Sequence, residues 1–159
     1  MPYFAAVFSR GDQGWTGSDI ELDDVEQIDD IADLMRDSAG QSDDVIVLLL
    51  EENDEWCAIV RLDGHTDPQV FLSDTRAAQS SELAGLLSEA VGAEWTEEDE
   101  GTAHPPATEP AGATDIFADY GLSPTELTRL AVKEGMLPAD VLTAVAERVG
   151  FAEELEQLR

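Results

Sequence analysis

Six consecutive apolar residues, VIVLLL at positions 45–50, decide the fold of this chain. Acidic residues stand on both sides of the run, at positions 43–44 and 51–52. A run of this length with charged flanks is typical of a strand that is covered on both faces, because a strand with one exposed face would alternate apolar and polar residues. We therefore expect residues 45–50 to form the central strand of a sheet.

The residues before this run predict two more strands. FAAVF at residues 4–8 is an apolar run of strand length, and the glycines of GDQG at residues 11–14 are typical of a turn. A weaker strand pattern follows at residues 15–22. We expect these two segments to be joined by that turn.

The residues after the run predict a tight hairpin and a further antiparallel strand. Asn53 and Asp54 tolerate positive φ, and they stand between the central run and residues 55–62. Alternate residues of that segment, from Trp56 to Leu62, are apolar and share one face. After another turn, residues 69–73 predict the third strand of this group.

Two helices with one apolar face are expected among these strands. Asp23 followed by Glu26 has the spacing of a capping box, and apolar residues then recur at helical spacing through residues 24–38. Leucines at helical spacing predict a second helix over residues 74–91. The first of these helices places its acidic residues on the outer face.

The composition changes after residue 91. Residues 92–114 are rich in Glu, Pro, Thr, Ala and Gly, and they hold too few apolar groups to offset the entropy cost of ordering, which predicts an acidic linker. Helical patterns return in residues 115–159, where Ser123, Pro124 and Glu126 have the positions of an N-cap, N1 and N3. The sequence leaves open whether these short helices dock on the sheet.

These patterns predict an α+β fold with a mostly antiparallel sheet of about five strands and two helices. We expect an α+β domain at residues 1–91 and an acidic linker rich in Pro, Ala, Gly and Thr at residues 92–114. A small helical segment at residues 115–159 completes the chain.

The charge of the chain restricts its partners. It carries 36 acidic and eight basic residues, a net charge of −28. Such a surface repels phosphate groups and anionic lipids, and no Lys or Arg cluster reverses the sign locally, so we expect no direct binding to nucleic acid or membranes. The charge either keeps a solvated surface soluble or selects a basic protein partner.

The sequence contains no constellation of catalytic, cofactor-binding or metal-binding residues. Cys57, the single cysteine, lies in an apolar strand pattern, which favours a buried small hydrophobe over a reactive thiol. His65 and His104 have no further ligands at metal-binding spacing, and the acidic stretches lack the alternating pattern of a calcium loop. We expect a protein that is not an enzyme and that holds no cofactor or metal.

Two aromatic residues are candidates for contact with a partner. Trp95 stands in the acidic linker, where an aromatic residue is either an anchor onto the domain or a partner contact, and Tyr120 lies where helical patterns return. The two helices that meet near residues 135–138 have the outline of a helix-turn-helix. Because the second of them carries only Arg148 as a base, a protein-binding element is favoured over a DNA-binding one.

The N-terminal residues favour a cytoplasmic protein. PYFAAVF lacks the basic start of a secretory leader and is too short for the apolar region of one. No apolar run approaches the length that spans a bilayer.

Several segments together resemble one protein family. They are PYFAAVF, DDVEQIDDIADLMRD, VLLLEENDEWCAIVRLDG, PQVFLSD and DIFADYGLSPTELTRLAVKEGMLPADVLTAVAERVGFAEELEQL. In this order and combination they are similar to the tRNA adenosine deaminase-associated proteins of actinobacteria, in which two patterned blocks flank a variable acidic linker. The resemblance covers nearly the whole chain except residues 92–114.

This resemblance implies a cytoplasmic protein linked, by gene neighbourhood, to the deaminase that makes inosine at the tRNA wobble position. The resemblance identifies no functional residues in this chain. The chain cannot be the deaminase, whose zinc needs a His and two Cys beside a catalytic Glu in H-x-E and P-C-x-x-C motifs. We expect a non-catalytic accessory protein that binds the deaminase or another basic partner. The alternative is an acidic interaction or regulatory module that is unrelated to tRNA editing.

Overall fold

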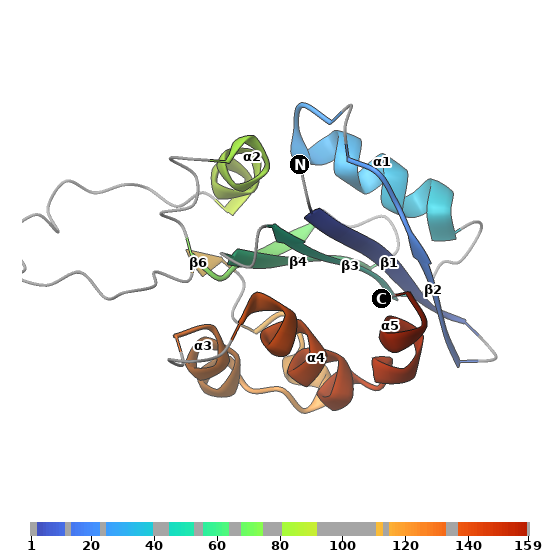
Figure 1. Ribbon diagram of the computed structural model, residues 1–159, viewed down its shortest axis with the longest axis vertical. Coiled ribbons are helices and arrows are strands. Elements are labelled where there is room, and N and C mark those ends of the chain that lie inside the picture. Colours follow the sequence, from blue (N-terminus) through green and yellow to red (C-terminus); the bar gives the residue numbers. More distant parts are fainter. Residues whose placement is uncertain are drawn as a thin grey trace, which may run out of the picture.

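The computed structural model of the chain contains one sheet with helices on both of its faces (Figure 1). The described residues are 3–11, 14–22, 25–39, 45–52, 56–63, 68–74, 81–91, 111–112, 115–132 and 137–158. The arrangement confirms the predicted α+β fold.

The sheet is antiparallel throughout, in the strand order β2-β1-β3-β4-β5-β6. The strands are β1 (Tyr3–Gly11), β2 (Gly14–Asp19), β3 (Val45–Glu52), β4 (Trp56–Asp63), β5 (Gln69–Leu72) and the two-residue β6 (Ala111–Gly112). β3 pairs with β1 on one side and with β4 on the other. The predicted central strand is therefore confirmed as the middle one of the five longer strands.

The apolar run of β3 is divided between two cores, because successive side chains of a strand point to opposite faces. Ile46, Leu48 and Leu50 belong to one core, and Val47 and Leu49 belong to the other. All five are at most 2% exposed. The run has no polar alternation because neither face of β3 reaches solvent.

Helices α1 (Ile28–Ala39) and α2 (Glu82–Val91) cover the first face of the sheet. Ile31 and Met35 of α1 and Leu87 of α2 are fully buried there. The alternate residues of β4 that were predicted to share a face, from Trp56 to Leu62, all lie in this core.

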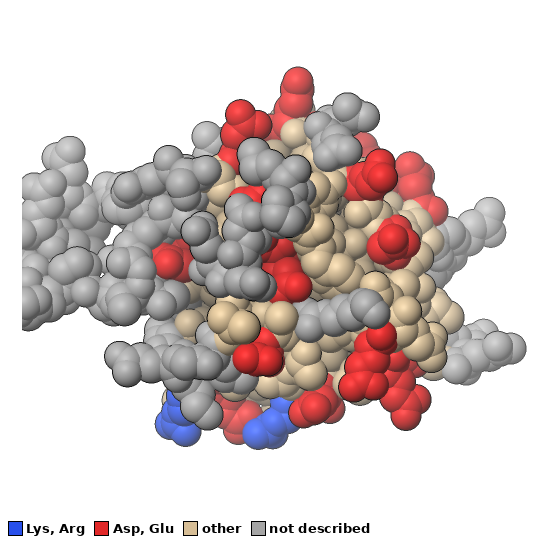
Figure 2. Space-filling view, in the orientation of Figure 1, with Lys and Arg blue, Asp and Glu red and all other residues tan. Residues whose placement is uncertain are grey.

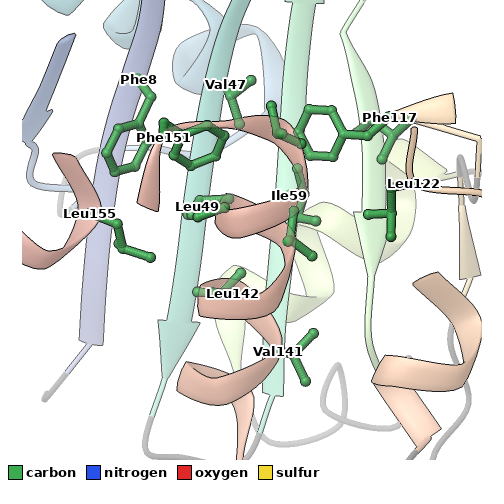
Figure 3. Packing of buried hydrophobic residues seen from close by; sticks show 14 of the residues in the cluster. Phe8, Val47, Leu49, Ile59, Phe117, Leu122, Val141, Leu142, Phe151 and Leu155 are labelled. Atoms are coloured by element: carbon green, nitrogen blue, oxygen red, sulfur yellow. The ribbon is translucent and has the colours of Figure 1, made fainter. Parts of the chain in front are cut away.

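The C-terminal helices cover the second face, which answers the question that the sequence leaves open. After the 3-10 helix η3 (Ala118–Tyr120) come α3 (Pro124–Val132), α4 (Pro138–Val149) and α5 (Ala152–Leu158). Leu142 of α4 lies over Leu49 and Ile59 of the sheet, and the ring of Phe151 stacks on that of Phe8 with 4.6 Å between centroids (Figure 3). Strands and C-terminal helices thus share one core.

Two C-terminal helix ends follow from their local sequence. The predicted cap of α3 is present, because the Glu126 backbone N–H donates to the Ser123 hydroxyl at 3.2 Å. Helix α4 ends at Gly150, whose φ of 116° is in the left-handed region that only glycine adopts without strain.

Several predicted boundaries are wrong. Helix α1 begins at Ile28 rather than at residue 24, because the Asp30 carboxylate accepts hydrogen bonds from the backbone N–H groups of Glu26 and Gln27 and holds them outside the helix. Helix α2 begins at Glu82 rather than at residue 74, after a cap by the Ser81 hydroxyl.

Two further differences concern the sheet. Strand β2 ends at Asp19 rather than at residue 22, because the chain then turns inward and buries Leu22 in the first core. Ala111 and Gly112, within the predicted linker, form β6 beside β5.

The remaining linker, the turn residues Asn53 and Asp54, and the cap residue Asp23 lie outside the described residues. Trp95, His65 and His104 also lie outside them. The division of the chain into parts at residues 1–91, 92–114 and 115–159 stays a prediction.

Candidate functional site

Arg61 of β4 connects the sheet to the start of the C-terminal layer. The residue is only 6% exposed, among apolar residues of the second core. Its guanidinium donates to the Ile116 carbonyl oxygen at 2.6 Å and to both carboxylate oxygens of Asp119 at 2.7 and 2.8 Å. Because a buried guanidinium is costly without such partners, this group fixes η3 against β4.

Tyr120, the candidate partner contact, packs against two arginines. The guanidinium carbons of Arg61 and Arg10 lie 5.2 and 5.7 Å from its ring centroid, and Arg10 Nη1 donates to its hydroxyl at 3.4 Å. The Trp15 ring is 6.1 Å away between centroids. Tyr120 is half-buried, so these contacts hold η3 to the edge of the sheet and leave part of the side chain exposed. Its contact with a partner stays a prediction, as does that of Trp95.

Two titratable groups of this layer have shifted pKa values. The hydrogen bond from Arg61 lowers the pKa of Asp119 below its ordinary value of 3.8. Burial raises the pKa of the Cys57 thiol to about 12, which keeps it protonated at neutral pH. The cysteine therefore has the buried, unreactive character that the sequence predicts.

The described residues contain no group of three His, Cys, Asp or Glu side chains placed to hold a metal ion. Within the same residues, no helix is both long and apolar enough to cross a membrane.

Acidic side chains are exposed on α1 and just before it, at and just after the end of β2, and on α5. We call this group the acidic edge, and its exposed members are Asp19, Glu21, Glu26, Asp29, Asp33, Asp37, Glu153 and Glu156. The one described base on these elements is Arg36, which lies 3.8 Å from Asp33. Figure 2 shows red side chains on several sides of the molecule, whereas its blue side chains lie only on the side of α3 and α4.

A hollow of about 410 Å³ lies within the acidic edge, and we call it the β2 hollow. Its lining residues are Tyr3, Phe4, Ala5, Asp19, Ile20, Glu21 and Leu158. It forms because β2 ends at Asp19, opposite Ala6, whereas β1 continues to Tyr3 and pairs there only with β3. The chain leaves the sheet after Ile20, and the Leu22 backbone N–H donates to the Tyr3 hydroxyl at 2.7 Å.

A second hollow, of about 360 Å³, lies between α3 and α4. Its lining residues are Glu126, Arg129, Leu130, Ala144, Glu147 and Arg148. Arg148 is paired with Glu126 at 3.0 Å. The hollow combines both signs of charge, so it selects neither a cationic nor an anionic partner.

Helix α4 does not have the surface of a DNA-recognition helix. Its apolar residues, among them Val141, Leu142 and Val145, are buried against the sheet. Its exposed charged residues are Asp140, Glu147 and Arg148, which carry a net negative charge. A phosphate backbone would be repelled from this helix.

Sequence reasoning missed Arg61 and the β2 hollow. A signal for Arg61 was present, because alternation in β4 places it on the face opposite Trp56, beside Cys57 and Ile59, where a charged residue needs a partner. The hollow had no such signal. It depends on where β2 ends and on the return of Leu158 from the far end of the chain.

Comparison with known proteins gives one match. A family described as Rv3753c-like tRNA adenosine deaminase-associated protein matches residues 3–152, which include the whole sheet and the C-terminal layer as far as the start of α5. No curated protein and no solved structure matches the chain.

Proposed function

Because the chain belongs to the Rv3753c-like tRNA adenosine deaminase-associated protein family, we propose that it is a non-catalytic accessory protein that binds the tRNA adenosine deaminase in the cytoplasm. The acidic edge is the surface that makes this contact. The family description supports the deaminase as the partner.

The observation that carries this proposal is the uniform sign of the acidic edge. Its eight exposed acids come from elements far apart in sequence, and Arg36 is the one described base among them. An enzyme that binds tRNA presents a positive face to the phosphates of its substrate. A negative protein surface is complementary to such a face and accelerates the encounter with it.

The residues of the chain argue against deaminase activity. Zinc-dependent deamination of adenosine requires a His and two Cys as ligands and a Glu as proton carrier. The chain has one cysteine and no His-x-Glu pattern. The proposed role is therefore to bind and regulate the enzyme rather than to share its chemistry.

The charge also argues against direct binding of tRNA. Affinity for a nucleic acid backbone comes mainly from Lys and Arg that displace its counterions. The chain has eight such residues against 36 acids, and Arg61 is buried by its contacts with Ile116 and Asp119.

The test is a titration of the purified deaminase with the full-length chain by isothermal calorimetry at two salt concentrations. We expect a complex that weakens as the salt rises, because the Debye length falls to about 8 Å near physiological ionic strength. A parallel titration with labelled tRNA should show no binding.

A matched pair of variants locates the surface. Replacing three acids of the acidic edge, Glu26→Gln, Asp29→Asn and Asp37→Asn, should weaken the complex. The control replaces three exposed acids elsewhere, at Glu82, Asp115 and Glu147, with their amides and changes the net charge equally. Equal weakening of the complex by both sets would contradict a localised binding surface. If the wild-type chain does not bind the deaminase, the two proteins are linked by gene neighbourhood alone.

A further inference from the structure

We propose that the β2 hollow is a binding site for a single arginine side chain of a protein partner. The proposal rests on the proposed function, since it names the contact within the acidic edge that would give that surface its specificity. Four side chains carry it: Asp19, Glu21, Phe4 and Leu158.

Asp19 and Phe4 lie on the same face of the sheet, and Glu21 and Leu158 line the hollow with them. Asp19 is opposite Ala6, which belongs to the core shared with the C-terminal helices, and Phe4 packs against that core too. Ile20 and Leu22 both pack in the first core, so Glu21 between them points away from that core, as Asp19 does. Leu158, at the end of α5, lies on this face as well.

Within the described residues, the two carboxylates in the hollow have no partner. Neither the Asp19 nor the Glu21 side chain makes an ion pair or a hydrogen bond there, and both residues are exposed. Basic side chains of the described part form ion pairs elsewhere, for example Arg61 with Asp119 and Arg36 with Asp33. Within the described residues, the two carboxylates are therefore open to a cation from a partner.

The shape of the hollow favours arginine over a compact cation. Phe4 and Leu158 provide apolar contact for the methylene groups of a long side chain. A planar guanidinium can donate to two carboxylates at once and can stack on an aromatic ring, whereas the lysine ammonium is a point charge. The volume of about 410 Å³ is within the range of sites for small ligands, roughly 300–1,000 Å³.

Two carboxylates do not make a site for a metal ion. Calcium takes six to eight oxygen ligands in proteins, and magnesium demands an octahedral set. Among the described residues that line the hollow, no further His, Cys, Asp or Glu stands beside Asp19 and Glu21.

The first test measures binding of small probes to the full-length chain by two-dimensional NMR. The probe is the blocked tripeptide acetyl-Gly-Arg-Gly-amide, and the comparison probes carry lysine or citrulline in place of arginine. We expect the amide signals of residues 4, 19–21 and 158 to shift with the arginine probe. The shifts should be weaker with lysine and absent with citrulline, which has the shape of arginine without its charge.

Variants then separate the hollow from general charge attraction. Asp19→Asn with Glu21→Gln should weaken binding of the arginine probe about tenfold or more, because both charge-assisted contacts are lost. Glu153→Gln with Glu156→Gln changes the net charge equally on α5 and should change the affinity less than about twofold. Equal loss in both double variants, or equal shifts with citrulline, would overturn the site.

The same variants, titrated with the purified deaminase, distinguish this proposal from the proposed function. Weaker binding by the Asp19/Glu21 variant than by the Glu153/Glu156 variant would support both. Equal binding by the two variants would overturn the hollow as the contact and leave the accessory role standing. Specific binding of the arginine probe without any complex with the deaminase would support the site and contradict the proposed partner.

Discussion

At the scale of single residues, Arg61 shows how one polar side chain fixes the position of a whole layer. It extends from the middle of the sheet into an apolar core and ends at the carbonyl of Ile116 and the carboxylate of Asp119. The two side chains of this ion pair differ in exposure: that of Asp119 is 60% exposed and that of Arg61 is 7% exposed. Water can solvate Asp119 if Arg61 is lost, whereas Arg61 keeps the Ile116 carbonyl oxygen as an acceptor if Asp119 is changed.

This inequality predicts different costs for the two partners. Arg61→Ala should lower the free energy of unfolding by about 2 kcal/mol or more, since it removes three charge-assisted hydrogen bonds and leaves the Ile116 carbonyl unpaired. Asp119→Asn should cost about 1 kcal/mol or less, because the Asn amide oxygen and the Ile116 carbonyl oxygen can still accept hydrogen bonds from Arg61.

Urea unfolding followed by circular dichroism measures both values. The control is Ser18→Ala, which removes a more exposed hydrogen bond, the one between the hydroxyls of Ser18 and Ser38. Equal losses for Arg61→Ala and Asp119→Asn would mean that the contact with Ile116 has no effect on stability.

At the scale of elements, those with a complete local signal could be predicted from the sequence. The apolar run of β3 needs no knowledge of its neighbours to be recognised as a buried strand, and Ser123 with Pro124 defines the start of α3 by local geometry alone. The docking of α4 and α5 could not be predicted. It depends on contacts such as Phe8 with Phe151, which are separated by most of the chain.

Strand β3 is also where a single substitution should have its largest effect. Val47→Asp should destabilise the fold by roughly 3 kcal/mol or more, because it places an unpaired charge in the core between β3 and the C-terminal helices. Val47 is fully buried there.

A thermal melt checks this prediction, and Thr16→Asp on the exposed strand β2 is the matched control. We expect the control to melt near the wild type and Val47→Asp to be insoluble or to lack a cooperative transition. A melt of Val47→Asp that resembles the wild type would show that β3 is not buried in solution.

At the scale of the whole molecule, the strands and the C-terminal helices share one core, although a linker is predicted between them. Residues from the strands and from the C-terminal helices pack together without an intervening layer, as Leu49 and Leu142 do (Figure 3). The composition of residues 92–114 predicts a linker, but the segments before and after it do not form separate cores.

Limited proteolysis should therefore cut the chain first between residues 94 and 114 and leave the two fragments together. We expect them to co-elute on size exclusion under native conditions and to separate in urea, because their common core is lost only on unfolding. Early cleavage within residues 45–73 would contradict the predicted linker. Fragments that separate without denaturant would contradict the importance of the shared core.

The covering helices follow the strands in the sequence, and this order affects how the protein is made. Ribosomes add about 5–20 residues per second, so residues 115–159 take roughly 2–9 s to synthesise. During that time the strands have emerged, and the rings and aliphatic groups that Phe8, Val47 and Ile59 place on the second face have no cover. Residues 1–114 already carry 27 acidic and four basic residues. Mutual repulsion between neighbouring nascent chains then delays their aggregation until the final helices close the fold.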